Sequence, residues 1–139
     1  MSLEENKAVI RREVDFWNGH DAEAITDVYA AGCIGHEPGG FHDGDLAQLK
    51  ASAAAIFGAF PDMRLTVEDL IAEGDKVVKR WVVHCTHTGD FMGIPATGKQ
   101  IVVRGINVFR IAGGKIQECW ATSDILGMMQ QLGVIPPLG

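Results

Sequence analysis

The stretch His87-Thr88-Gly89-Asp90-Phe91-Met92-Gly93-Ile94-Pro95-Ala96-Thr97-Gly98-Lys99 connects two long apolar segments of the chain. Its glycines and its proline are typical of a loop. The segment before it, Val77 to His87, and the segment after it, Gln100 to Ile111, have the composition and length of strands. The sequence therefore predicts two neighbouring strands joined by this loop.

The chain on either side of these strands continues the same pattern. Ala112-Gly113-Gly114 predicts a turn into a further strand, Lys115 to Trp120. A short helix is expected from Ile125 to Leu132, ending at Gly133. Upstream, apolar and polar residues alternate from Met63 to Glu68, as in a half-buried strand, and Glu73-Gly74-Asp75 predicts its hairpin turn.

The N-terminal half has helical patterns instead. Ser2 and Glu5 form a capping box for a helix to about Asn18. Asp21 is expected to cap a second helix through Tyr29, and Asp43 or Asp45 a third, Leu46 to Ala59. The intervening segment from Ala31 to His36 is either a short strand or an extended turn.

Helices followed by an antiparallel sheet and a closing helix predict an α+β fold. We expect residues 1–139 to form one domain, with a sheet that curls around the N-terminal helices as a cone. Such a cone would leave a cavity for a small hydrophobic ligand or substrate.

The composition narrows the class of partner. The net charge is −6 and no cluster of Lys or Arg is present, which argues against nucleic acid and against an anionic membrane surface. No apolar stretch approaches the roughly 20 residues of a membrane span. Three widely spaced cysteines and a polar, acidic N-terminus favour a reduced, cytoplasmic protein.

The segment from Gln100 to Ile111 is apolar on both of its strand faces. A sheet with one covered face should alternate, so we expect helices on one face and a second subunit on the other. This predicts a homodimer through the outer sheet face, with Trp81 or Trp120 as anchor.

Three polar residues are candidates for the chemistry. Asn107 is the only polar side chain on an apolar strand face, where it serves either a ligand or a structural hydrogen bond. The imidazole of His36 suits an acid or base, unless it is an exposed loop histidine. Asp124 stands where the last strand meets the last helix, and helix capping is the commoner explanation for it.

Four further residues complete the candidate substrate-binding set. Trp17 and Tyr29 belong to the helical lid, although core packing is the simpler interpretation for both. His84 and Arg80 share one face of their strand. His87 falls on the opposite face from His84, so no metal site is expected from this histidine pair.

Three motifs together resemble the SnoaL-like polyketide cyclases of the nuclear-transport-factor-2-like superfamily. They are the Thr-Gly-x-Phe-x-Gly-Ile-Pro-x-Thr-Gly loop from Thr88 to Gly98, the hairpin with Phe109-Arg110-Ile111 and Gly114-Lys115-Ile116, and Gln131-Leu132-Gly133. The resemblance covers about Val9 to Gly133. It implies a cone-shaped α+β barrel of the cystatin-like type. It also implies ring closure of an aromatic polyketide ester by intramolecular aldol condensation, without a cofactor.

One position departs from that pattern. The resemblance implies a catalytic carboxylate directly after Trp120, where this chain has Ala121, while His36 and Asn107 match the polar companions. Three alternatives follow: Asp124 reaches the cavity from the strand end, His36 is the base, or the protein binds a ligand without aldol chemistry. Epoxide hydrolysis, with Arg80 or Arg104 beside Asp124, is a third function on this scaffold, after cyclisation and non-catalytic binding.

Overall fold

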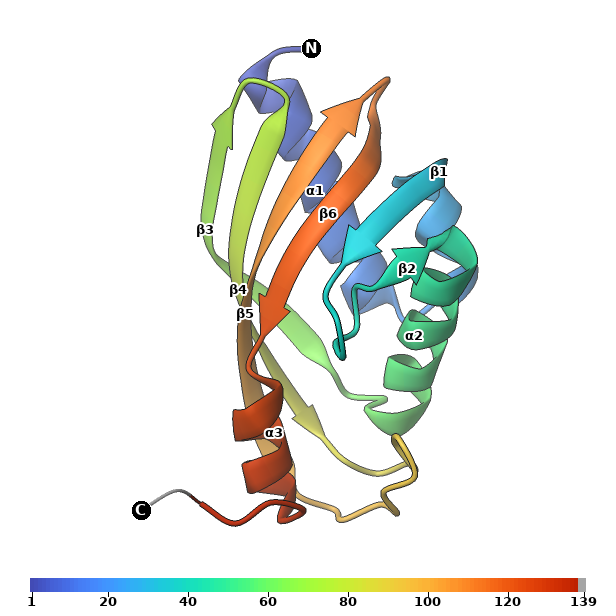
Figure 1. The fold of residues 1–139 in the computed structure, drawn as a ribbon, viewed down its shortest axis with the longest axis vertical. Coiled ribbons are helices and arrows are strands. Elements are labelled where there is room, and N and C mark those ends of the chain that lie inside the picture. Colours follow the sequence, from blue (N-terminus) through green and yellow to red (C-terminus); the bar gives the residue numbers. More distant parts are fainter. Residues whose placement is uncertain (138–139) are drawn as a thin grey trace.

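The computed structural model describes residues 1–137 and contains one six-stranded sheet with helices packed on it (Figure 1). The helices are α1 (Leu3–Gly19), the 3-10 helix η1 (Ala22–Asp27), α2 (Leu46–Ala59) and α3 (Ile125–Leu132). The strands are β1 (Tyr29–His36), β2 (Gly44–Asp45), β3 (Arg64–Glu73), β4 (Lys76–Thr86), β5 (Gln100–Ala112) and β6 (Lys115–Ser123). None of these helices is long and apolar enough to cross a membrane.

The helix boundaries follow from their caps. The capping box of Ser2 and Glu5 is present, and Asp45 forms a second one with Gln48 at the start of α2. The second expected helix is shorter than predicted, because only η1 forms and Tyr29 already pairs with Ile116 of β6. Strand pairing therefore takes Tyr29 out of the predicted helix.

The strand order is β2-β1-β6-β5-β4-β3. The pairs β3–β4, β4–β5, β5–β6 and β1–β2 are antiparallel, as expected, but β1 runs parallel to β6. After β2 the chain crosses through α2 to β3, at the far edge of the sheet. The sheet is mixed, because its β1–β6 pair is parallel and its other pairs are antiparallel. The sheet curls but does not close, so the predicted α+β cone is confirmed as an open one.

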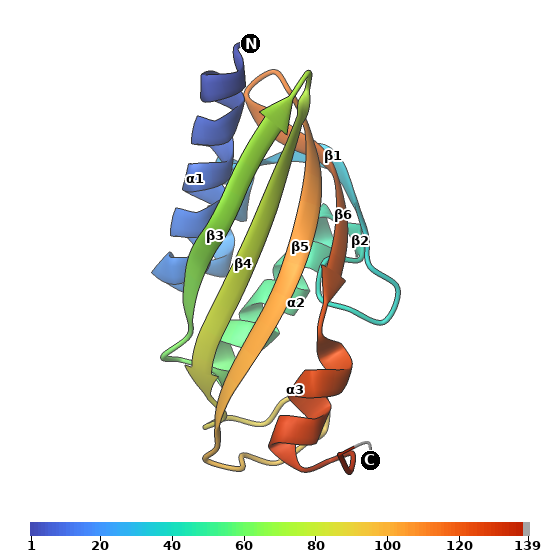
Figure 2. The same cartoon turned by 90° about the vertical axis from the view of Figure 1, so that its left-hand side faces the viewer.

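The curled sheet has two different faces. In Figure 2 the strands β3, β4 and β5 lie in front, without a helix over them, and α1 and α2 lie behind. Alternate residues of β4 face the helices: Lys79, Trp81 and Val83 are buried, while Arg80 and His84 are exposed on the outer face. Trp81 therefore cannot anchor a contact on the outer face, and that half of the prediction is wrong.

A buried ion pair fastens α1 to the sheet. Lys79 Nζ of β4 donates to Glu13 Oε1 of α1 at 2.6 Å, and both side chains are fully buried. The second oxygen of Glu13 accepts from Trp17 Nε1 at 2.9 Å and from the Tyr29 hydroxyl at 3.3 Å. One carboxylate thus joins α1, β1 and β4, and every polar atom in this group has a partner.

Removing one member of this pair should destabilise the protein strongly. The substitution Lys79→Met leaves the Glu13 carboxylate charged and buried, so the free energy of unfolding should fall by about 3–5 kcal/mol. Urea denaturation followed by circular dichroism measures this loss. The matched control is Lys50→Ala, which breaks an exposed 2.6 Å pair with Glu23 and should cost only about 0–1 kcal/mol. Equal losses for the two variants would contradict the role assigned to burial.

Candidate active site

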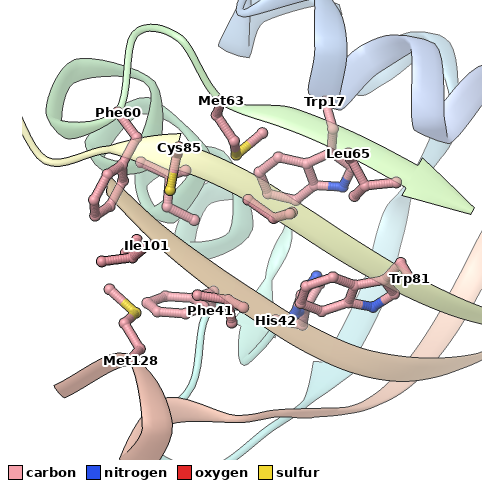
Figure 3. Close-up of a pocket in the computed structure, with 13 residues that line it drawn as sticks. Trp17, Phe41, His42, Phe60, Met63, Leu65, Trp81, Cys85, Ile101 and Met128 are labelled. Carbon is pink, nitrogen blue, oxygen red and sulfur yellow. The ribbon is translucent and has the colours of Figure 1, made fainter. Parts of the chain in front are cut away.

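An apolar cavity lies between the helices and the concave face of the sheet (Figure 3). Its volume is about 60 Å³, counted as the space open to the centres of water molecules. The side chains that line it are Trp17, Phe41, His42, Ile56, Phe60, Met63, Leu65, Trp81, Val83, Cys85, Ile101, Val103 and Met128. Among these thirteen, Phe41 alone is half-buried rather than buried, so it marks the boundary between the cavity and solvent.

One titratable pair stands at the wall of this cavity. His42 lines the cavity, and its Nδ1 lies 2.8 Å from Oε1 of Glu37, with both side chains buried. An ionised carboxylate only accepts hydrogen bonds, so Nδ1 carries the proton and donates. Whenever the ring is neutral, Nε2 is the nitrogen without a proton. The pair has the arrangement of a histidine base oriented by a carboxylate.

The loop between β1 and α2 builds this pair around the Glu37 side chain. Oε1 of Glu37 also accepts the backbone N–H groups of Phe41, at 2.9 Å, and of His42, at 3.1 Å. Gly40 is required at the turn, because a Cβ there would lie 2.2 Å from the Glu37 side chain. The carboxylate therefore folds the loop and fixes the imidazole at the same time.

The environment of Glu37 keeps it ionised. Burial by itself raises its pKa, but the hydrogen bonds and charge of His42, with a contribution from Ser123, outweigh burial and lower the pKa to about 2. Its other oxygen, Oε2, is buried without a hydrogen-bond partner in the protein. The Glu37 carboxylate is thus a permanent negative charge behind His42 at neutral pH.

Behind the other wall of the cavity lies Asn107. It accepts a hydrogen bond from Trp81 Nε1 and donates to Cys119 Sγ at 3.3 Å, and it is fully buried. The Trp81 ring lies over its strand neighbour Gly105, where a Cβ would come within 2.2 Å of the indole. Asn107 itself does not line the cavity. It affects the cavity only by fixing the orientation of the Trp81 ring.

The structure does not bring His36, Asn107 and Asp124 together. His36 is exposed on the outer face, where its Nε2 lies 2.7 Å from Glu118 Oε2 and its ring stacks on Trp120 at 5.6 Å. The hydrogen bond from His36, followed by that from Arg110, lowers the pKa of the Glu118 carboxyl. The alternation of β1 turns His36 outward, away from the apolar cavity.

Asp124 is exposed and caps α3, accepting the Gly127 N–H at 2.9 Å. It borders an open groove that also includes Arg80 and Arg104. Arg80 is held there by Glu68 and Asp69, each at 2.7 Å. The residues considered for epoxide hydrolysis therefore lie outside the apolar cavity.

The remaining candidates divide between the two faces. Trp17 lines the cavity, whereas Tyr29 is buried against Glu13 beside it. His84 is exposed on the outer face and His87 buried on the inner one, as strand alternation predicts. Ala121 sits opposite Asn107 on the inner face of β6, half-buried, at the place where the resemblance implied a carboxylate.

Sequence reasoning missed Glu37 and His42. A signal for Glu37 was available: Cys33 and Gly35 share the inner side of β1, and Glu37 continues this alternation one residue beyond the strand. His42 had no comparable signal. It follows a Pro38-Gly39-Gly40 turn, and its position depends on hydrogen bonds to Glu37 rather than on any periodicity.

Comparison with known proteins identifies the chain's relatives. The family model for the SnoaL-like polyketide cyclases matches residues 7–132. The chain belongs to this family. The aklanonic acid methyl ester cyclase DnrD of Streptomyces peucetius is 26% identical over 130 residues, spanning 90% of this chain and 88% of that protein.

Solved structures of this SnoaL-like chain's relatives agree with its fold. AclR of Streptomyces galilaeus, named as a proposed hydroxylase, is 28% identical with a TM-score of 0.89, over 99% of this chain and 87% of that one. IdmH of Streptomyces antibioticus is 31% identical with a TM-score of 0.79, over 92% and 98%. The activities named for these relatives differ, cyclase for DnrD and hydroxylase for AclR, so membership in the family does not by itself fix the reaction.

The low pKa of Glu37 makes a pH-dependent contribution to stability. This contribution is present above the ordinary value of 4.5 and is lost as the pH falls through about 2. The difference in free energy of unfolding between wild type and Glu37→Gln should therefore be largest above pH 4.5 and should shrink towards pH 2. Urea denaturation across this range measures it, with exposed Glu4→Gln as control. A difference that stays constant with pH would contradict the assignment.

Proposed function

We propose that this protein is a proton-transfer enzyme of the polyketide-cyclase type, acting on a small hydrophobic carbonyl compound, with His42 as base and Glu37 as its orienting partner. The observation that carries the proposal is the buried His42–Glu37 pair at the wall of an otherwise apolar cavity. A base in such a place is what cyclisation through an enolate requires.

The geometry supports a two-step use of one imidazole. Nε2 of His42 removes a proton from a carbon next to a carbonyl and leaves an enolate, while Glu37 stabilises the imidazolium that forms. The enolate carbon attacks a second carbonyl of the same molecule, and the imidazolium returns its proton to the new alkoxide. His42 returns the proton that it removed, and Glu37 stabilises its charge in between. His42 can therefore serve as the base although position 121 is an alanine.

Trp17, Trp81 and Asn107 have supporting roles in this proposal. Trp17 and Trp81 provide aromatic walls, and their indole N–H groups are already committed to Glu13 and Asn107. Asn107 is thus a positioning residue that acts through Trp81. Tyr29 acts in the same indirect way through Glu13, since its hydroxyl shares that carboxylate with Trp17.

A non-catalytic binding module is the second candidate. It would need a cavity without an acid/base pair, and the His42–Glu37 pair favours the enzyme instead. Cofactor independence and a cytoplasmic location stay predictions from the sequence.

Deuterium uptake tests the base without knowledge of the natural substrate. The probe is 2-indanone, whose α-protons are acidified by both ring and carbonyl, incubated with the protein in heavy water and followed by proton NMR. The catalysed exchange rate should fall about 10²–10⁴-fold in His42→Gln. Ring closure of aklanonic acid methyl ester, the compound in the relative's name, is the parallel assay for cyclisation.

Two further variants decide between alternative assignments in the same assay. His36→Gln and Asp124→Asn alter the residues that the sequence suggested and that lie outside the cavity, so each should exchange at close to the wild-type rate. Circular dichroism verifies folding, since loss of the Asp124 cap costs about 0.5–2 kcal/mol. A large loss in either variant, with His42→Gln unaffected, would transfer the role of base away from His42.

The predicted homodimer is also a proposal, and the outer face supports it. Ile34, Ile106 and Trp120 form an outer apolar patch, with exposed fractions of 42%, 46% and 37%. Ion pairs lie on both sides of this patch: Arg110 with Glu118, and Arg80 with Glu68. Such a patch with a charged rim suits a self-complementary interface.

Charge placed in the patch should dissociate the dimer. Trp120→Glu and Ile106→Glu are each expected to lower the sedimentation coefficient from that of a dimer to that of a monomer in velocity centrifugation. The control is Leu3→Glu, an equally exposed apolar residue on α1. A wild-type protein that already sediments as a monomer would refute the proposed interface.

A further inference from the structure

The two oxygens of the Glu37 carboxylate are held unequally. Oε1 accepts hydrogen bonds from the imidazole and the backbone N–H of His42 and from the backbone N–H of Phe41. Oε2 is buried and has no hydrogen-bond partner. A buried carboxylate oxygen without a donor is costly in free energy, so a donor is expected close to Oε2.

Ser123 is the polar side chain that β6 directs towards Glu37. The inner-face positions at the end of β6 are Cys119, Ala121 and Ser123, since strand residues alternate. β1 runs parallel beside this strand, and Glu37 follows directly after β1, so its side chain lies along the same inner row (Figure 1). Ala121 ends at a methyl group, and the Cys119 sulfur is engaged by Asn107. Of the three, only Ser123 offers a hydroxyl as donor.

Electrostatic effects on the ionisable groups indicate the same neighbourhood. Burial raises the pKa of the Cys119 thiol to about 12, and the negative charge of Glu37 adds to this rise. Burial raises the pKa of Glu37, the hydrogen bond and charge of His42 lower it, and Ser123 adds to this lowering, to about 2 overall. Ser123 Oγ is itself buried without a partner. A donor and an acceptor, both buried and both unpaired, thus lie close together.

We propose that Ser123 is a positioning residue of the site, whose hydroxyl donates to Oε2 of Glu37, directly or through one bridging water, and keeps Oε1 facing His42. The inference rests on the proposed function in taking the His42–Glu37 pair as the base. A carboxylate held by one oxygen can rotate about its last side-chain bond, and this rotation breaks its hydrogen bonds to the loop. With both oxygens held, one from the loop and one from β6, the imidazole keeps a single orientation.

Kinetics of serine variants test this role. In Ser123→Ala, proton exchange of 2-indanone should slow about tenfold without a comparable change in KM, because the orientation of the base is lost and no substrate contact is. Ser123→Thr keeps the hydroxyl and should restore the rate. The matched control is Thr122→Ala, which removes a hydroxyl from the next residue, on the exposed outer face. A rate in Ser123→Ala equal to that of the control, or a threonine variant as slow as the alanine one, would overturn the proposal.

A second readout needs no substrate. The backbone N–H groups of Phe41 and His42 bond to Oε1, so a carboxylate that rotates leaves them open to solvent. Their hydrogen exchange, followed by NMR in heavy water, should accelerate about tenfold in Ser123→Ala and return to the wild-type rate in Ser123→Thr, while the amides of β4 and β5 keep their rates. Unchanged protection at these two amides, or an equal loss across the whole sheet, would contradict the positioning role.

The two proposals fail in different measurements. Amide exchange is recorded without turnover, so Ser123 can hold Glu37 even if His42→Gln leaves the exchange of 2-indanone unchanged and thereby removes the proposed base. Conversely, if His42→Gln abolishes that exchange while Ser123→Ala alters neither the rate nor the amide protection, the base stands and the role of Ser123 falls.

Discussion

The Glu13 carboxylate is the interaction on which the arrangement of the cone depends. It lies in the core, where an isolated charge would be prohibitively unfavourable, and is made tolerable by Lys79, Trp17 and Tyr29. Lys79 and Tyr29 belong to strands of the sheet and Trp17 to α1 itself, so the carboxylate holds α1 in one orientation against β4 and β1. Since Trp17 also lines the cavity, the carboxylate that holds α1 on the sheet also fixes one wall of the site.

Glu37 repeats this arrangement at the cavity itself. One of its oxygens accepts hydrogen bonds from two backbone N–H groups and from the imidazole of His42. These bonds fix the conformation of a glycine-rich loop. The two buried carboxylates differ in what they hold. Glu13 is satisfied by a cation and by donors that face away from the cavity, whereas Glu37 holds a ring that still has a free nitrogen. Only the second arrangement is suited to chemistry.

The regular elements were predictable because each carries its own local signal. Asp45 begins α2 and Leu132 ends α3 where the caps place them, and the period-two pattern of β5 correctly put Asn107 on the inner face. The site was less predictable. His36 and Glu37 are adjacent, and strand alternation sends them to opposite faces, so a one-residue difference in the assumed register exchanges an outer histidine for an inner carboxylate. His42 lies in a loop, where position is fixed by contacts that no sequence period reveals.

The three tryptophans are distributed in a way that gives the protein its own optical reporters. Trp17 and Trp81 face the cavity, while Trp120 lies on the opposite side of the sheet, stacked on His36. Indole emission depends on the polarity around the ring, so events inside the cone and events on its outer surface act on different fluorophores. A chain with phenylalanine in place of Trp120 would emit from the cavity walls alone, and one that kept only Trp120 would emit from the outer sheet.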